Sequence, residues 1–100
     1  MSTVTQTGKE LEREMSALPA DIARGLAVAF PGAVQGGPVR FVVTLPNAAM
    51  ELELTPGPDR VIALLRLPTL TLRIRFTDGD AAAQAELVRR FDLAMRRGGG

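Results

Sequence analysis

The sequence has 100 residues, of which 46% are hydrophobic and 23% charged, a composition typical of one globular domain with its own core rather than of a disordered chain. Its net charge of +1 gives almost no field to attract nucleic acid or an anionic membrane. The absence of Cys and His excludes disulfides, thiolate metal sites and catalysis through a Ser-His or Cys-His pair. We therefore expect a protein that is not an enzyme and holds no metal or cofactor.

Residues 1–6 are small and polar without periodicity, so we expect a flexible N-terminal segment ahead of a single domain over residues 7–97. The N-terminus lacks the basic and apolar regions of a signal peptide, and no run of about 18 apolar residues occurs, which predicts a cytoplasmic protein without a membrane anchor. Arginine outnumbers lysine eleven to one, which indicates a GC-rich bacterial genome.

An N-terminal helix is predicted after residues 7–10, whose sequence Thr-Gly-Lys-Glu matches a helix capping box. Proline at position 19 interrupts the helix, because an interior proline removes a hydrogen bond and clashes with the preceding turn at a cost of about 3 kcal/mol. We expect a kink or a break at Pro19, giving either one bent helix or two helices over about 8–17 and 19–30. The apolar stripe of this region, spaced by three or four residues, comprises Leu11, Met15, Leu18, Ile22, Leu26 and Phe30.

A 3–4-stranded antiparallel meander is predicted after the Gly- and Pro-rich connection at residues 31–38. The two-residue period typical of half-buried strands occurs in segments 39–45, 50–55 and 70–77, and apolar and polar residues alternate strictly in the last of these. Segment 61–67 is apolar on both faces apart from Arg66, which favours a central strand. We favour a hairpin at residues 68–69 over one long strand bent at Pro68.

A C-terminal helix is predicted over about residues 80–97, with Asp78 or Asp80 as its cap. Its apolar stripe comprises Ala83, Leu87, Val88, Phe91, Ala94 and Met95. The last three glycines, residues 98–100, end this helix and leave a flexible tail. They resemble the Gly-Gly ends of ubiquitin-like modifiers and sulfur carriers over these three residues only. The predicted fold is thus a two-layer α+β domain.

The second face of the predicted sheet is the candidate partner-binding surface. Pairing of the last two strands about Leu67 and Leu70 places Leu64 opposite Arg73 and Ile62 opposite Arg75, and a neighbouring register places Glu51 opposite Arg66. The face is then partly apolar, and its candidate residues are Val42, Ile62, Leu64, Arg73 and Arg75. Either a helix or the arginine stems cover it within the monomer, or a partner does. A homodimer through the sheet is the simplest such partner.

A nucleic-acid-binding dimer is the first alternative. Its residues are two arginine pairs spaced by seven on the last helix: Arg89, Arg90, Arg96 and Arg97. The order of helix, antiparallel strands and helix resembles that of the YbaB-type nucleoid-associated dimers. A structural explanation is also open, with Glu86 paired to Arg90 and Asp92 paired to Arg96 along the helix. A carrier of a small apolar ligand, bound between helices and sheet, is the second alternative.

The remaining polar clusters favour no chemistry. Glu51 and Glu53 share one side of a strand, and Asp78 and Asp80 share a turn, so we expect both pairs to be solvated or capping. The glycine-rich segment 32–37 lacks the Lys-Ser or Lys-Thr of a phosphate loop and is predicted to be a connector. The sequence therefore favours a non-enzymatic accessory or protein-interaction domain.

Overall fold

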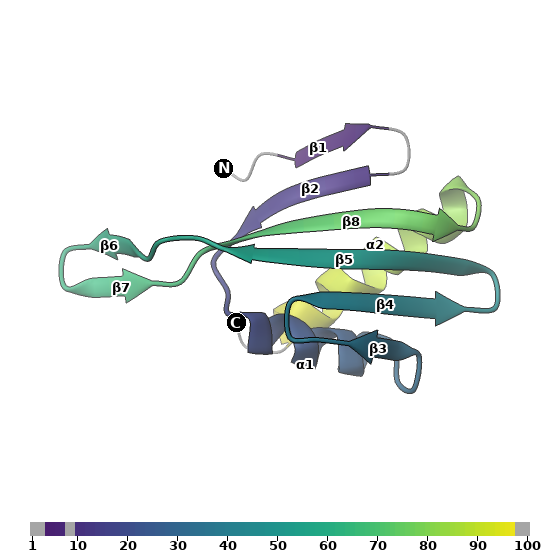
Figure 1. The fold of residues 1–100 in the computed structure, drawn as a ribbon, viewed down its shortest axis with the longest axis horizontal. Coiled ribbons are helices and arrows are strands. Elements are labelled where there is room, and N and C mark those ends of the chain that lie inside the picture. The colour runs from purple at the N-terminus through teal and green to yellow at the C-terminus, as the bar shows by residue number, and fades with distance from the viewer. Residues whose placement is uncertain (1–3, 8–9, 98–100) are drawn as a thin grey trace.

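The computed structural model describes residues 4–7 and 10–97 (Figure 1). It confirms the predicted α+β class, with a helix before most of an antiparallel sheet and a second helix at the end. The elements in chain order are β1 Val4–Thr7, β2 Glu10–Met15, α1 Pro19–Ala29, β3 Val34–Gly36, β4 Arg40–Leu45, β5 Ala48–Pro56, β6 Arg60–Ile62, β7 Leu65–Leu67, β8 Leu70–Asp78 and α2 Ala81–Arg97.

Six strands form one antiparallel sheet in the order β1-β2-β8-β5-β4-β3, and β6 and β7 form a separate two-stranded sheet. Both helices lie on the same face of the six-stranded sheet (Figure 1). The sheet is larger than the predicted meander because β1 and β2 join it at one edge and β3 at the other. One face of the sheet is therefore covered by helices, and the other is open.

The core lies between the sheet and the two helices. Along β8, Leu72, Ile74 and Phe76 are buried, while Arg73 and Arg75 between them are exposed on the open face. Alternation of this kind follows from the two-residue period of a strand. The helices contribute Ile22, Leu26, Phe30, Leu87 and Phe91, all at most 1% exposed. Full burial of each such side chain contributes about 1.5–3 kcal/mol.

The predicted helix over residues 8–17 is wrong, because residues 10–15 form strand β2. This strand pairs with β8, with Leu11 opposite Ile74. Leu11 and Met15 are four residues apart, a spacing that places both on one face of a strand as well as of a helix. Residues 7 and 10 pair with each other across the β1–β2 ladder, and so do not form the expected capping box.

The predicted helix that starts at Pro19 is confirmed, since α1 begins at this residue, but it follows a strand, so Pro19 neither kinks nor interrupts a longer helix. Proline suits the first helical position because its missing N–H has no partner there. The Asp21 carboxylate accepts a hydrogen bond from the Leu18 amide at 2.9 Å and so closes the first turn. At the second helix, Asp80 Oδ1 accepts a hydrogen bond from the Ala83 amide at 2.8 Å, which confirms the predicted cap.

Segment 61–67 is not a central strand. Strand β5 pairs directly with β8, with Pro56 opposite Leu70, so the segment between them has no place in the sheet. It folds back on itself as the β6–β7 hairpin, with Ile62 opposite Leu65. The hairpin projects from the body of the molecule (Figure 1). With the hairpin included, the molecule measures 46 × 28 × 21 Å along its principal axes.

The predicted strand pairings that involve this segment are therefore wrong. Arg73 lies between Glu12 and Glu53 rather than opposite Leu64. Glu51 lies opposite Arg75, which was expected opposite Ile62, and the expected Glu51–Arg66 pair is absent from the described registers. The segment was expected to fill the sheet because an apolar run without alternation is typical of a strand buried on both faces.

The two chain ends bear on the predicted domain bounds. Residues 4–7, most of which fall in the N-terminal segment expected to be flexible, form strand β1 and pair with residues 10–13 of β2. The glycine tail, residues 98–100, lies outside the described residues, and with it the resemblance to ubiquitin-like tails.

The assignment of β2 predicts a sharp difference between two leucines of the former helical stripe. Leu11 is 5% exposed and faces the core, whereas Leu18 is 53% exposed before α1. Leu11→Ala should lower the free energy of unfolding by about 2–4 kcal/mol, because it leaves a cavity. Leu18→Ala should lower it by about 1 kcal/mol or less. Urea denaturation measures both, and equal losses would contradict the strand assignment.

Candidate functional site

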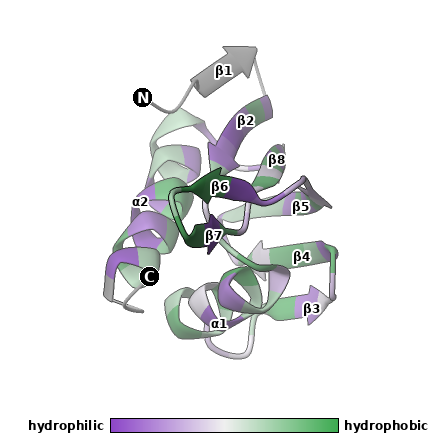
Figure 2. Cartoon of the chain, turned by 90° about the vertical axis from the view of Figure 1, so that its left-hand side faces the viewer, coloured by the Kyte–Doolittle hydropathy of each residue, from purple (hydrophilic) through white to green (hydrophobic). Residues whose placement is uncertain are grey.

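The candidate site is the β6–β7 hairpin, residues 60–67, which we call the arm. It carries four large apolar side chains with high exposed fractions: Leu64 at 100%, Leu65 at 62%, Val61 at 60% and Ile62 at 50%. Seen end-on, the arm is strongly hydrophobic along β6 and at its turn (Figure 2). Contiguous apolar side chains on a projecting element mark an interaction surface, since they are costly to leave in water.

The turn of the arm is unusual in sequence. Two-residue hairpin turns favour Gly, Asn or Asp, because at least one of the two residues takes a positive φ. Here the turn is Ala63-Leu64, and Ala63 has a φ of 52°. An L-residue in this region costs about 1–2 kcal/mol relative to the right-handed conformation. The tip therefore has neither the residue types that favour the turn nor polar side chains to solvate it.

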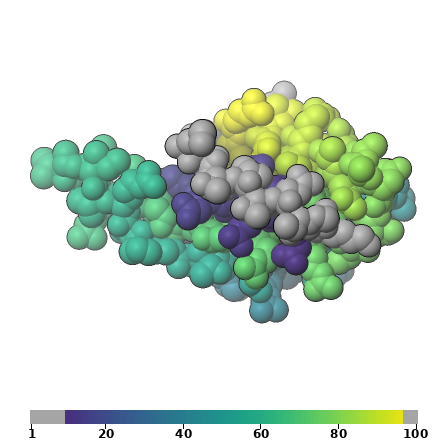
Figure 3. All heavy atoms as spheres, turned by 90° about the horizontal axis from the view of Figure 1, so that it is seen from above, coloured from purple at the N-terminus to yellow at the C-terminus, as the bar shows by residue number. Residues whose placement is uncertain are grey.

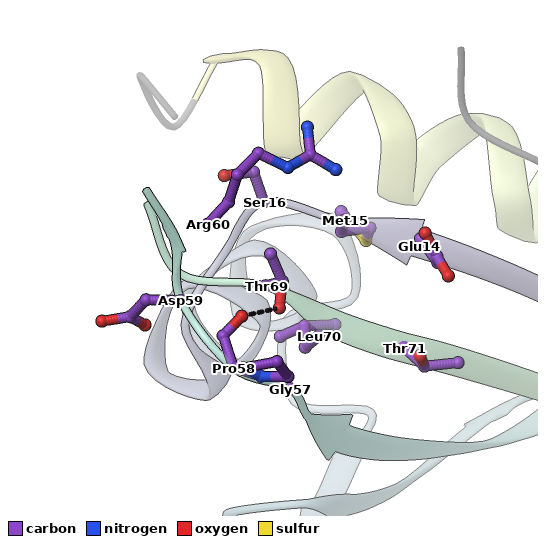
Figure 4. Close-up of a pocket in the computed structure, with 10 residues that line it drawn as sticks. All are labelled: Glu14, Met15, Ser16, Gly57, Pro58, Asp59, Arg60, Thr69, Leu70 and Thr71. Atoms are coloured by element: carbon purple, nitrogen blue, oxygen red, sulfur yellow. Dashed lines mark hydrogen bonds between the residues drawn. The ribbon is translucent and has the colours of Figure 1, made fainter. Parts of the chain in front are cut away.

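Hydrogen bonds hold the root of the arm to the body. Thr69 Oγ1 donates to the Pro58 carbonyl at 2.7 Å, and the Gly57 amide donates to the Thr69 carbonyl at 2.9 Å (Figure 4). Ser16 Oγ, from the segment after β2, donates to the Pro68 carbonyl at 2.9 Å. Ser16, Gly57, Pro58 and Thr69 line a hollow of about 560 Å³ beside these bonds. The direction in which the arm leaves the body is thus set by the chain itself.

A second hollow, the helix groove, lies between α1, α2 and the end of β2. Its volume is about 370 Å³, and its apolar lining comprises Met15, Ala17, Gly25, Val28, Ala94 and Met95. Gly25 lets the helices approach, because a Cβ at this position would overlap the Met95 side chain. Val28 is 61% exposed at the groove. The charged side chains of Asp21, Arg24 and Arg96 also line the groove.

The open face of the six-stranded sheet is charged. Two rows of alternating sign cross it: Glu10, Arg75 and Glu51 in one, and Glu12, Arg73, Glu53 and Arg40 in the other. Arg73 pairs with Glu12 at 3.1 Å and Arg40 with Glu53 at 2.9 Å. The hydrogen bond to Glu12 raises the pKa of Arg73 above its ordinary value. Among the residues whose side chains the structure describes, the large apolar side chain exposed on this face is Val42, at 39%.

The structure separates the predicted partner-binding residues into two groups. Val42, Arg73 and Arg75 lie on the open face of the sheet, whereas Ile62 and Leu64 lie on the arm. The other exposed arm residues, Val61 and Leu65, and the groove residues were not identified from the sequence. The apolar run at 61–65 was the available signal for the arm.

The predicted arginine stripe on α2 is partly used within the fold. Arg89 makes two hydrogen bonds to Glu86, both at 2.7 Å, in place of the expected pair of Glu86 with Arg90. Arg90 instead donates to the Ala29 carbonyl, and its guanidinium lies 4.8 Å from the centre of the Phe30 ring. Arg90 thus joins α2 to the end of α1.

In the second arginine pair of the stripe, Arg96 and Arg97, Arg96 does not form the contact expected within the helix. Asp92 pairs with Arg13 of β2 rather than with Arg96. Arg96 lines the helix groove, and the side chain of Arg97 lies outside the described residues. Binding of nucleic acid by these arginines stays a prediction, as does the apolar-ligand carrier, for which the helix groove is the available hollow.

The acidic pairs have structural partners. Glu53 pairs with Arg40, Asp78 Oδ1 accepts a hydrogen bond from the Gly79 amide at 2.9 Å, and Asp80 caps α2. Within residues 4–7 and 10–97, no three Asp or Glu side chains lie close enough together to hold a metal ion.

Comparison with known proteins does not assign the chain to a family. The chain matches no family model, no curated protein and no solved structure. In the part of the chain that the structure describes, neither helix is long and apolar enough to cross a membrane.

The Glu86–Arg89 contact predicts a measurable titration. The hydrogen bond from Arg89 lowers the pKa of Glu86 from its ordinary value of 4.5, so the contact adds stability above that pH, which is lost as the pH falls through the lowered pKa. In Arg89→Gln the pKa of Glu86, followed by NMR of its side-chain carboxyl, should rise toward 4.5. Arg96→Gln, the control, should leave it unchanged. An unchanged pKa in Arg89→Gln would show that the contact is not formed.

Proposed function

We propose that this chain is a non-enzymatic protein-interaction domain that associates with a second copy of itself through the arm. The observation that carries the proposal is the complete exposure of Leu64, together with Leu65, Val61 and Ile62, on a hairpin held away from the body. A cytoplasmic location and a bacterial source remain expectations from the sequence.

The energetics of the arm support a partner. An isolated two-stranded hairpin is marginally stable in water. The arm has one ion pair, Arg66 with Asp59 at 3.8 Å, between side chains that are 75% and 48% exposed. Such an exposed pair contributes about 0–1 kcal/mol. Burying each large apolar side chain against a partner would contribute about 1.5–3 kcal/mol, so contact with a partner is the largest stabilisation open to the arm.

The choice of surface differs from the expected dimer through the sheet. The open face is charged, and desolvating its ion pairs would offset much of what their contact with a partner gains. The arm has apolar side chains, and because β6 and β7 pair only with each other, the outer edge of each strand is unpaired. An edge of this kind pairs readily with a second copy, and a twofold axis perpendicular to the strands makes that pairing antiparallel.

Replacing the most exposed apolar residue of the arm tests the proposal. In Leu64→Lys the self-association measured by sedimentation velocity should weaken by about 100-fold or more, because the charge must lose its water on contact. Measured at a concentration at which both proteins are monomeric, its unfolding temperature should stay close to that of the native chain, since Leu64 is fully exposed.

Val42→Lys is the matched control, because it places the same charge on the open face of the sheet, opposite Glu51. It should leave self-association unchanged. Loss of association in Val42→Lys but not in Leu64→Lys would assign the interface to the sheet, and a native chain that stays monomeric at high concentration would overturn the proposal.

A further inference from the structure

We propose that the arm of one copy seats in the helix groove of the second copy, and that the second arm makes the same contact in return. This rests on the proposed function, in that the arm is taken as the contact surface. It adds the surface that receives the arm.

The arm and the helix groove lie at the same end of the molecule. Met15 and Ser16 line both the groove and the hollow at the root of the arm. In Figure 1, the start of α1 and the end of α2 lie near the point where the arm leaves the sheet. A partner that covers this end therefore meets both surfaces at once.

The arm does not fold onto the groove of its own chain. The hydrogen bonds of Ser16 to Pro68 and of Thr69 to Pro58 hold its root in place. From there the arm extends outward, as the projection from the body in Figure 3 shows. From Arg60 to the tip at Leu64 it spans about 13 Å, at about 3.3 Å per residue. That reach carries the tip away from its own body and toward a facing copy.

A twofold axis perpendicular to the arm satisfies both contacts. It sets two arms antiparallel beside each other, so the tip of each lies at the root of the other, where the groove is. The interface is then isologous and closes at two copies, whereas an arm-to-groove contact without this symmetry would extend into a chain of molecules.

The lining of the groove fits an apolar tip. A water molecule takes about 30 Å³ of liquid volume, and the groove, at about 370 Å³, is large enough for whole side chains. Ala17 and Ala94 place only small side chains along the groove, and the two methionines in its lining adapt their shape to an inserted leucine. The fully exposed Leu64 and its neighbour Leu65 are the side chains that would enter.

Val28→Glu tests the groove, with Ala27→Glu as its matched control. Both positions are exposed on α1, but only Val28 lines the groove. Sedimentation velocity should show that Val28→Glu weakens self-association by about 30-fold or more, whereas Ala27→Glu behaves as the native chain. Circular dichroism checks that each variant keeps its helices.

Mixing two variants tests the pairing itself. Leu64→Lys lacks a working arm but keeps its groove, and Val28→Glu lacks a working groove but keeps its arm. Their mixture should form a heterodimer with one native contact and one contact between Lys and Glu, at a concentration at which neither variant dimerises alone.

Failure of the mixture to associate would overturn the arm-to-groove contact. Loss of association in Leu64→Lys with none in Val28→Glu would also overturn it, but would leave the proposed function intact. Full association in Leu64→Lys would overturn both.

Discussion

Side-chain alternation along β8 constrains most of the other elements. This strand lies between β2 and β5, so its buried residues, such as Leu72 and Ile74, define the face that both helices must cover. The residues that alternate with them, Arg73 and Arg75, lie opposite glutamates of both neighbouring strands. The open face is thereby solvated and charged. Because β5 and β8 pair directly, the apolar segment between them is excluded from the sheet, and it becomes an exposed arm instead of a core strand.

Much of the fold could be predicted because local and tertiary preferences agree. Proline at position 19 and the cap at Asp80 begin helices where the sequence indicated, and the alternating segments form β4, β5 and β8. Residues 10–15 were wrongly assigned to a helix, because Glu, Leu, Arg and Met favour helices in isolation. Their strand conformation comes from pairing with β8, an interaction between segments about 60 residues apart that no local pattern records.

The candidate site was predicted only in part, since it depends on which apolar residues remain outside the core, and this is decided by tertiary packing. The apolar run at 61–67 has no alternation and no Gly or Asn to mark a turn, so it fits a buried strand. Its exposure follows from the β5–β8 pairing. The helix groove depends on the approach of α1 and α2 at Gly25, which is also tertiary information. Ile62 and Leu64 were nevertheless named as candidate partner-binding residues, because an exposed apolar side chain suggests a contact surface whether it lies on a sheet or on a hairpin.

Hydrogen–deuterium exchange at several protein concentrations tests the central claim most directly, because it reports on the arm and the groove in the unmodified chain. If a second copy covers the arm, the amides of residues 60–67 gain protection as the concentration rises, and those lining the groove near Gly25 and Met95 gain it over the same range. Exchange in the arm that is fast and independent of concentration would contradict the account.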